Sequence, residues 1–162
     1  MTLKKPALDP MTLAARTSSG YPEPYRSRVL PREKRALGDP LGLTKIGINH
    51  TTLPPGKESS MRHWHTHEDE FIFVLSGEVV VITEAGEQVL GAGMCAGFPA
   101  SADGRTGDGH QLVNRGTLTA RLLTVGARSD EDFCEYSDID LRLTAGRYSG
   151  RARFTHKDGT PY

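Results

Sequence analysis

The amino-acid sequence predicts an all-β domain, either a sandwich or a barrel. From residue 41 onward, short apolar or alternating runs are separated by glycine and proline at the intervals typical of such folds. Residues 83–88, TEAGEQ, have the glycine-bearing composition of a tight connection between antiparallel strands. With 162 residues, the chain is long enough for one domain to bury a core without help from metals or disulfides.

The expected strands lie between these glycine and proline positions. They span residues 44–52, 61–67, 70–76, 78–83, 87–90, 94–98, 110–114 and 120–125. Residues 100–109, ASADGRTGDG, contain three glycines and no periodic apolar residue, so we expect a long loop there. Residues 1–40 carry six prolines among scattered charges, a composition that disfavours long helices and central strands. We therefore expect an irregular arm at the N-terminal end.

The composition excludes several classes of partner. Twenty basic and twenty acidic residues cancel, so no net charge attracts nucleic acid or an anionic membrane. The longest unbroken apolar runs, such as residues 71–75, are much too short to span a bilayer. The two cysteines, Cys95 and Cys134, are too few and too far apart for a disulfide framework or a thiolate zinc site. We expect a cytoplasmic protein that acts on a small molecule, without nucleic-acid or membrane partners.

Residues 62–78, RHWHTHEDEFIFVLSGE, contain the strongest chemical signal of the sequence. Alternate side chains of a strand point to one face, so His63, His65 and His67 can share a face. Two imidazoles on such a strand can bind one ion at roughly 2.0–2.2 Å each, provided that other elements supply further ligands. An isolated HxH pair is nevertheless more often an exposed polar rim, because short motifs match by chance.

Three acidic residues follow the histidines and differ in their expected environment. If a strand begins near Glu70, then Glu70, Ile72 and Val74 share one face, and Glu70 is the lone acid on an apolar inward side. An ionised carboxylate there would be costly without a cation or a proton. Glu68 and Asp69 are expected in the connecting turn, where water solvates them.

The wider spacing resembles that of the cupin superfamily of small β-barrels. The first cupin motif runs Gly, five residues, HxH, three or four residues, Glu, six residues, Gly. The chain has Gly56, His63, His65, Glu70 and Gly77 in that order, with six residues instead of five before the first histidine.

The second cupin motif is present with one insertion. It runs Gly, five residues, Pro, x, Gly, two residues, His, three residues, Asn. The chain has Gly93, five residues, Pro99, then a longer loop, then His110, three residues and Asn114. The segments LGDPLGLTKIGINHTTLPPG, CAGFPA and THKDGTPY are also similar to a group of single-domain bacterial cupins, some of which carry a sugar-phosphate isomerase label.

This resemblance implies a fold, a domain organisation and a metal site. The fold is a double-stranded β-helix, or jelly-roll barrel, over residues 41–128, with the arm at 1–40 and a C-terminal extension at 129–162 packing on the barrel. The implied metal ligands are His63, His65, Glu70 and His110. Three imidazoles and one carboxylate suit a divalent transition metal, Zn, Mn, Fe, Ni, Co or Cu, better than Mg or Ca.

Three functions are compatible with such a site. In the first hypothesis, the metal polarises a small polar metabolite such as a sugar phosphate for isomerisation. The candidate general base is then His67, and the candidate phosphate-binding residues are Lys45, Arg105 and Arg121, although each can equally be a solvated surface residue. The alternatives are an Fe- or Cu-dependent dioxygenase and a non-catalytic small-molecule binding module.

The outward faces of the strands suggest self-association. Trp64, Phe71 and Phe73 alternate with the inward-facing residues and would form an apolar surface to be covered. We therefore expect a homodimer, with the N-terminal arm a candidate for crossing between subunits.

Overall fold

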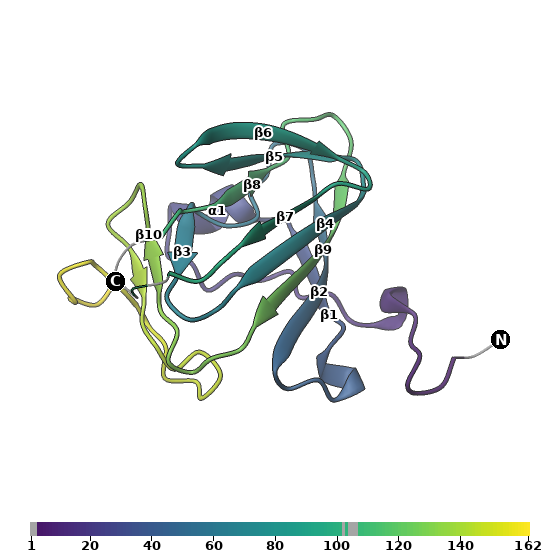
Figure 1. The fold of residues 1–162 in the computed structure, drawn as a ribbon, viewed down its shortest axis with the longest axis horizontal. Coiled ribbons are helices and arrows are strands. Elements are labelled where there is room, and N and C mark those ends of the chain that lie inside the picture. Colours follow the sequence, from purple (N-terminus) through teal and green to yellow (C-terminus); the bar gives the residue numbers. More distant parts are fainter. Residues whose placement is uncertain (1–2, 102, 104–106) are drawn as a thin grey trace.

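The expected strands are present in the computed structural model, which describes residues 3–101, 103 and 107–162. The eight expected strands are β2 to β9, and each of their ends lies within two residues of the expected position. They are β2 (Ile46–Leu53), β3 (His63–His65), β4 (Glu70–Ser76), β5 (Glu78–Thr83), β6 (Gly86–Gly91), β7 (Cys95–Phe98), β8 (Gln111–Val113) and β9 (Ala120–Ala127). The all-β class predicted from the sequence is confirmed (Figure 1).

The largest sheet has five antiparallel strands in the order β1-β2-β9-β4-β7. Its first strand is β1 (Glu33–Ala36), which pairs with β2 and places Lys34 opposite Thr51. A second sheet has the order β6-β5-β8, and TEAGEQ connects β5 to β6 as expected. The strands β10 (Cys134–Tyr136), β11 (Arg142–Leu143) and β12 (Phe154–Thr155) continue from β3 into a third sheet. Three antiparallel sheets therefore surround the interior of the molecule.

Alternation along β4 separates an inward face from an outward one. Ile72 and Val74 are 4% and 0% exposed, whereas Phe71 is 41% exposed. The inward apolar residues pack with those of β5, β8 and β9, for example Val79, Leu112 and Leu122, into the larger hydrophobic core. Glu70 is on the same inward face, as the sequence predicted, but it lies at the end of the strand beyond this core.

The two flanking segments form a second core together. Tyr21 and Val29 of the N-terminal segment pack with Met61, Tyr136 and Leu141. The first 41 residues include a short helix, α1 (Tyr25–Val29), two 3-10 turns, Pro10–Thr12 and Asp39–Leu41, and the edge strand β1. The part that follows Gly20 is ordered by apolar packing and by pairing with β2. The C-terminal segment packs on the barrel, and β10 pairs directly with β3.

No helix within residues 3–101, 103 and 107–162 combines the length and the apolar character needed to cross a membrane.

Candidate functional site

The HxH segment is held between the C-terminal segment and the loop that precedes β8. β3 pairs with β10, so that His65 lies opposite Cys134 and His63 opposite Tyr136. On its other side, His63 forms an isolated bridge with His110, with N–H to O distances of 3.2 and 2.8 Å. His63, His65 and His110 are 9%, 3% and 6% exposed. The strand pairing therefore buries three imidazoles beside one another.

The four ligands implied by the family resemblance lie together. The Nε2 atom of His110 is 2.8 Å from Oε2 of Glu70, and Nε2 of His65 is 3.6 Å from the same oxygen. The ring centroid of His63 lies 4.9 Å from that of His65 and 4.8 Å from that of His110. Ligand atoms of His63, Glu70 and His110 all lie within 4.8 Å of one another. The barrel thus brings together residues that are up to 47 positions apart in the sequence.

Hydrogen bonds fix how two of the histidines present their nitrogens. Nδ1 of His63 lies 2.9 Å from the carbonyl oxygen of Met61 and Nδ1 of His65 lies 2.7 Å from Oδ2 of Asp132. A carbonyl and an ionised carboxylate only accept, so each Nδ1 donates and each Nε2 faces the cluster. His110 is oriented differently, by the ring of Phe98, which stacks on it at 3.9 Å with an interplanar angle of 6°.

Asp132 organises the residues behind the histidines. Its carboxylate is buried, and Oδ1 accepts from the backbone N–H of Thr66 and of His67, both at 2.9 Å. Its other oxygen, Oδ2, accepts from His65 and, at 3.4 Å, from Nη2 of Arg147. These bonds hold the pKa of Asp132 below its ordinary value although burial acts in the opposite direction.

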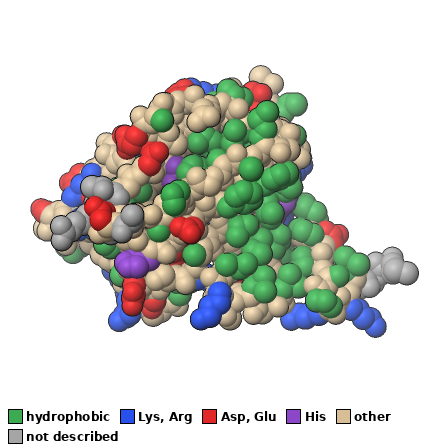
Figure 2. Space-filling model, in the orientation of Figure 1, with side chains coloured by type: hydrophobic (Ala, Val, Ile, Leu, Met, Phe, Trp, Pro, Cys, Tyr) green, Lys and Arg blue, Asp and Glu red, His purple; other side chains and the backbone are tan. Residues whose placement is uncertain are grey.

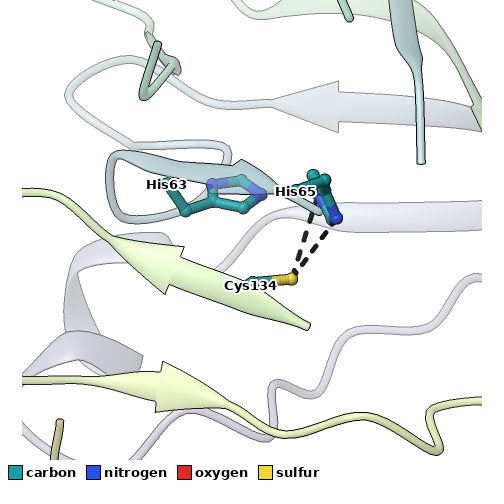
Figure 3. Close-up of side chains that lie close together, drawn as sticks. All are labelled: His63, His65 and Cys134. Carbon is teal, nitrogen blue, oxygen red and sulfur yellow. Dashed lines mark hydrogen bonds between the residues drawn. The ribbon is translucent and has the colours of Figure 1, made fainter. Parts of the chain in front are cut away.

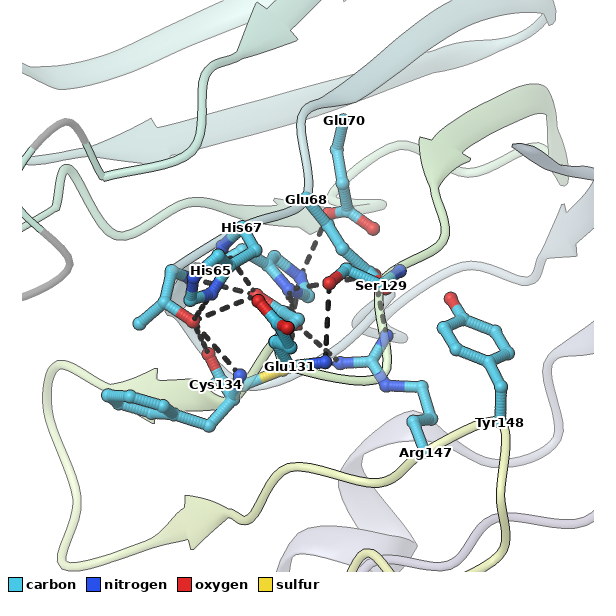
Figure 4. Close-up of polar contacts among 12 residues, drawn as sticks. His65, His67, Glu68, Glu70, Ser129, Glu131, Cys134, Arg147 and Tyr148 are labelled. Atoms are coloured by element: carbon cyan, nitrogen blue, oxygen red, sulfur yellow. Dashed lines mark hydrogen bonds and ion pairs between the residues drawn. The ribbon is translucent and has the colours of Figure 1, made fainter. Parts of the chain in front are cut away.

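Arg147 connects the same group to two further buried residues. Nη1 lies 3.3 Å from Oε2 of Glu68, and Nη2 lies 2.6 Å from Sγ of Cys134 (Figure 4). Cys134 in turn lies 3.5 Å from Nδ1 of His65, and Figure 3 shows its sulfur below the His65 ring. Glu68 also accepts from the backbone N–H of Ser129 at 2.8 Å.

The position of Glu68 corrects the expectation from the sequence. Glu68 is only 2% exposed, although the sequence suggested a solvated turn residue. Arg147 and Ser129 supply the partners that make its burial possible, and burial raises its pKa. Asp69 is exposed, as expected, and accepts from the backbone N–H of Ala100 at 2.7 Å.

Burial and neighbouring charges give the central residues different protonation states. Burial, with His110 and His65 nearby, lowers the pKa of His63 well below its ordinary value, so its imidazole is neutral. Burial opposes ionisation of Glu70, yet hydrogen bonds from His110 and His65 hold its pKa well below the usual range. For His65, burial is outweighed by Cys134 and Asp132, which raise its pKa. The cluster therefore contains a neutral imidazole and an ionised carboxylate, both suited to binding a cation.

A cavity of about 630 Å³ opens in front of the histidines. Its lining includes all four family-implied ligands, the buried Glu68 and residues of the N-terminal segment. Gly47 and Gly126 belong to the lining and lie on facing strands, opposite each other in register. A Cβ atom at Gly126 would lie 3.6 Å from Oε1 of Glu70, so the absence of side chains leaves room beside the carboxylate. The volume is that of a small-molecule site.

Three of the four residues predicted to act on substrate lie outside the cavity lining. The ring of His67 is exposed, bonds to Oγ1 of Thr66 at 2.8 Å and does not line the cavity. Lys45 and Arg121 are exposed and do not line it either. Arg105 lies outside the described residues. Roles for these four residues stay predictions, without support from the position of the three that are described.

Two residues of the site, Asp132 and Arg147, were not predicted from the sequence, and Glu68 was predicted to be solvated. Asp132, Arg147 and Glu68 lie in polar segments that show no periodicity, and the barrel motifs end before two of them. The signal for Asp132 was its place in SDEDFCEY, where an acid precedes the apolar residues Phe133 and Cys134. That pattern alone does not separate a buried acid from an exposed one.

Comparison with known proteins identifies the family. The family model named Cupin domain matches residues 49–126. A crystal structure from Silicibacter pomeroyi, described as a sugar phosphate isomerase of the cupin superfamily, is 38% identical over 97% of this chain and 96% of that one, with a TM-score of 0.89. The chain therefore belongs to the cupin superfamily.

Further solved structures share the fold. An Acidithiobacillus ferrooxidans protein, for which sugar phosphate isomerase activity has been suggested, is 31% identical over 81% of this chain and 80% of that chain (TM-score 0.70). The polyketide cyclase RemF of Streptomyces resistomycificus is 18% identical over 75% of this chain and 78% of its own (TM-score 0.60), a likeness of fold alone. A search of curated proteins finds no match to this sequence.

The donor set fits a transition-metal ion. Donor atoms bound to one ion at roughly 2.0–2.2 Å lie roughly 3 to 4 Å apart, and the 3.6 Å between Nε2 of His65 and Oε2 of Glu70 is in that range. The structure also contains two other groups of close donors, His63, His65 and Cys134, and His65, Glu68 and Asp132. In these two groups Cys134, Asp132 and Glu68 are in contact with Arg147, which disfavours a second cation.

Proposed function

We propose that the protein is a metal-dependent isomerase that acts on a small polar metabolite such as a sugar phosphate. The observation that carries the proposal is the convergence of His63, His65, Glu70 and His110 at the wall of a cavity of about 630 Å³. The names of the relatives from Silicibacter pomeroyi and Acidithiobacillus ferrooxidans, 38% and 31% identical, support the substrate class.

These four residues would hold one divalent transition metal. Such an ion supplies a Lewis acid that polarises a carbonyl or hydroxyl of the substrate. The protein contributes the orientation of the ligands, because Met61 and Asp132 each hold one Nδ1 atom and direct Nε2 to the cluster. The choice among Zn, Mn, Fe, Ni, Co and Cu does not follow from these ligand types.

Isomerisation also needs a group that moves a proton between neighbouring carbon atoms. His67 does not line the cavity, whereas the carboxylate of Glu68 and the side chain of Tyr148 do. Figure 4 shows both near Arg147, which faces Glu68. We propose Glu68 for this role in place of His67, since a proton-transfer group must reach the substrate.

Metal content and turnover test the proposal together. Protein purified without added metal should contain about one transition-metal ion per chain, and His63→Ala and His110→Ala should lose most of it. The matched control is His156→Ala, because His156 is bonded to Asp140 on the surface, away from the cavity. Equal metal content in all four proteins would refute the site.

A panel of aldose and ketose phosphates then tests the reaction. Glu68→Gln should reduce turnover by at least a hundredfold with metal content retained, in the range that general acid–base groups contribute, whereas His67→Gln should change it little. Oxygen consumption by the wild-type protein without any isomerase reaction would favour the dioxygenase alternative. Saturable ligand binding without turnover by the metal-loaded protein would favour a binding module.

We also propose a homodimer that forms through the outward face of the five-stranded sheet. Phe71 and Leu75 are 41% and 45% exposed there, and Phe71 lies beside Val125 of β9. Figure 2 shows hydrophobic side chains gathered over β4, β9 and β2. A second copy of the chain is the simplest occupant of an apolar surface. Light scattering should give twice the monomer mass, and Phe71→Asp should give the monomer; a monomeric wild type at micromolar concentration would refute the proposal.

The free thiols of Cys95 and Cys134 lead us to propose a cytoplasmic location.

A further inference from the structure

Among the residues that the structure describes, five basic ones line the cavity, and two of them are paired with acids. They are Arg16, Arg32, Lys34, Arg128 and Arg147. Arg147 is held by Glu68 and Asp132, and Arg128 forms an ion pair with Asp39. These two side chains are therefore neutralised within the fold and serve its structure.

The other three basic side chains have no such partner. Arg16, Arg32 and Lys34 make no ion pair and no side-chain hydrogen bond with any residue that the structure describes. Arg32 is nevertheless only 7% exposed, a degree of burial that an arginine rarely reaches unless it is paired. Its guanidinium is an unpartnered group in the wall of a cavity.

Backbone pairing brings the three residues to one place. Arg16 and Lys34 form an antiparallel bridge, with N–H to O distances of 2.8 and 3.0 Å. Side chains of directly opposed residues lie on the same side of such a pair. Lys34 follows Arg32 by two positions, and both belong to the cavity lining. The N-terminal segment thus places three cationic side chains at the cavity, with Arg32 buried, Lys34 half-buried and Arg16 exposed.

The three cations act unfavourably on one another. Burial and the neighbouring Arg32 lower the pKa of Lys34 from 10.5 to about 7. Glu70 acts in the opposite direction, and Arg16 and Arg147 add smaller lowering effects. Burial also lowers the pKa of Arg32, and Arg16 adds to this effect. A cluster that costs stability in this way is a mark of a binding site, because a bound anion would remove the repulsion.

We propose that Arg16, Arg32 and Lys34 form a subsite that binds a phosphate monoester dianion. The inference rests on the proposed function, since it assigns the phosphate of the substrate to the wall that faces the histidine cluster. Two guanidinium groups and an ammonium supply several charged donors, a set that suits three phosphate oxygens better than one carboxylate.

The geometry of the sheet relates this subsite to the histidines. β2 and β9 lie between β1 and β4, so a strand spacing of about 4.8 Å places Lys34 about 14 Å from β4 across the sheet. The register places Lys34 level with Thr51, Leu122 and Val74, so Glu70 lies four residues, about 13 Å, further along β4. The sheet is curved and both side chains point inward, which shortens the distance between Lys34 and Glu70. One small molecule can therefore contact the histidine cluster at one end and the cations at the other.

Calorimetric titration with inorganic phosphate tests the subsite. The protein is used as isolated, at constant ionic strength set with chloride. Arg32→Met and Lys34→Met should each weaken phosphate binding by about tenfold or more, and Lys34→Arg should restore it. The matched controls, Lys45→Met and Arg121→Met, remove exposed cations outside the cavity and should change the affinity less than twofold.

The accompanying measurements make each outcome decisive. Arg32→Met and Lys34→Met should raise the melting temperature, because they remove uncompensated charge; a lower melting temperature would show a structural role and overturn the proposal. Phosphate binding that is lost in His110→Ala but kept in Arg32→Met would place the anion on the metal instead. Acetate that binds as tightly as phosphate would indicate a carboxylate site and refute the dianion.

Failure of the subsite and of the proposed function can be told apart. If isolated protein contains the metal and isomerises a sugar phosphate but Arg32→Met binds phosphate normally, the subsite is wrong and the proposed function stands. If phosphate binding depends on Arg32 and Lys34 but no metal is found, the subsite stands and the proposed metal-dependent reaction is wrong.

Discussion

Replacement of Asp132 should affect stability and metal binding by separable amounts. In Asp132→Ala, the backbone N–H groups of Thr66 and His67 and the Nδ1–H of His65 lose their acceptor in a buried site. An unpaired buried donor costs about 1–3 kcal/mol, so three of them should lower the free energy of unfolding by about 3–9 kcal/mol. The lower bound assumes that water enters the space left by the carboxylate.

Asp132→Asn tests the orientation of His65 with less damage to the fold. Its carbonyl oxygen can still accept from the backbone N–H groups of Thr66 and His67, but its amide then points N–H groups at Nδ1 of His65 and at Arg147. We expect a loss of about 1–3 kcal/mol of stability, together with a 10- to 100-fold loss of metal affinity, the usual cost of removing the partner of a ligating histidine.

The assay combines urea unfolding with metal competition against a chromophoric chelator. Asp140→Asn is the matched control, because Asp140 also contacts a histidine Nδ1, that of His156, at 2.8 Å, but on the surface. It should change the free energy of unfolding little, because the pair is exposed to solvent, and leave metal affinity unchanged. Metal affinity within twofold of the wild type in both Asp132 variants would refute the reasoning.

Three further predictions concern Lys34, Gly77 and Asn114. The pKa of Lys34 falls from 10.5 to about 7 in the fold, so the unfolded chain binds more protons between these values and the contribution of Lys34 to stability rises with pH there. The pKa shift corresponds to at most about 5 kcal/mol of stability. After solvent screening, Lys34→Met should stabilise the protein by about 2 kcal/mol near pH 6 and should have no effect near pH 10.5. A stability difference in urea unfolding that does not change with pH would contradict this. Gly77→Ala should lower the free energy of unfolding by at least about 2 kcal/mol, because φ is +75° and the new Cβ would lie 2.9 Å from Cα of Ala120. The control is Gly56→Ala, where φ is +72° and no atom lies within 4 Å of the new Cβ. It should cost only about 1 kcal/mol in the same assay. Asn114→Ala should lower the thermal midpoint by at least about 5 °C, since the buried amide donates to the carbonyl oxygens of Leu53 and Leu118, and an unchanged midpoint would argue against those bonds.

The strands could be predicted because their pattern is local. Glu70 to Ser76 alternates between inward and outward residues, and glycine at position 77 ends the strand at a positive φ. The same alternation correctly placed Glu70 on the inward face. The spacing of the two motifs also selected His63, His65 and His110, because a strand fixes the direction of each side chain and the barrel fixes which strands meet.

The walls of the cavity depend on contacts that no local pattern encodes. β1 has the sequence EKRA, which does not alternate, and its pairing with β2 is what places Lys34 inside the barrel. Asp132 and Arg147 come from the segment after β9, where short turns replace regular elements. Lys45 and Arg121 were therefore predicted as phosphate-binding residues because of their charge, and the cations that line the cavity were not.

The two ends of the cavity differ in whether their buried charged groups have partners. At the histidine end, buried polar groups have partners: Asp132 holds His65, and Arg147 neutralises Glu68. At the other end, Arg32 and Lys34 are held near each other, and neither forms an ion pair within the part of the chain that the structure describes. A fold under selection for stability alone would lose these charges, since apolar residues would pack there at lower cost. Their retention on β1 and the turn before it is most simply explained by a ligand that brings its own negative charge.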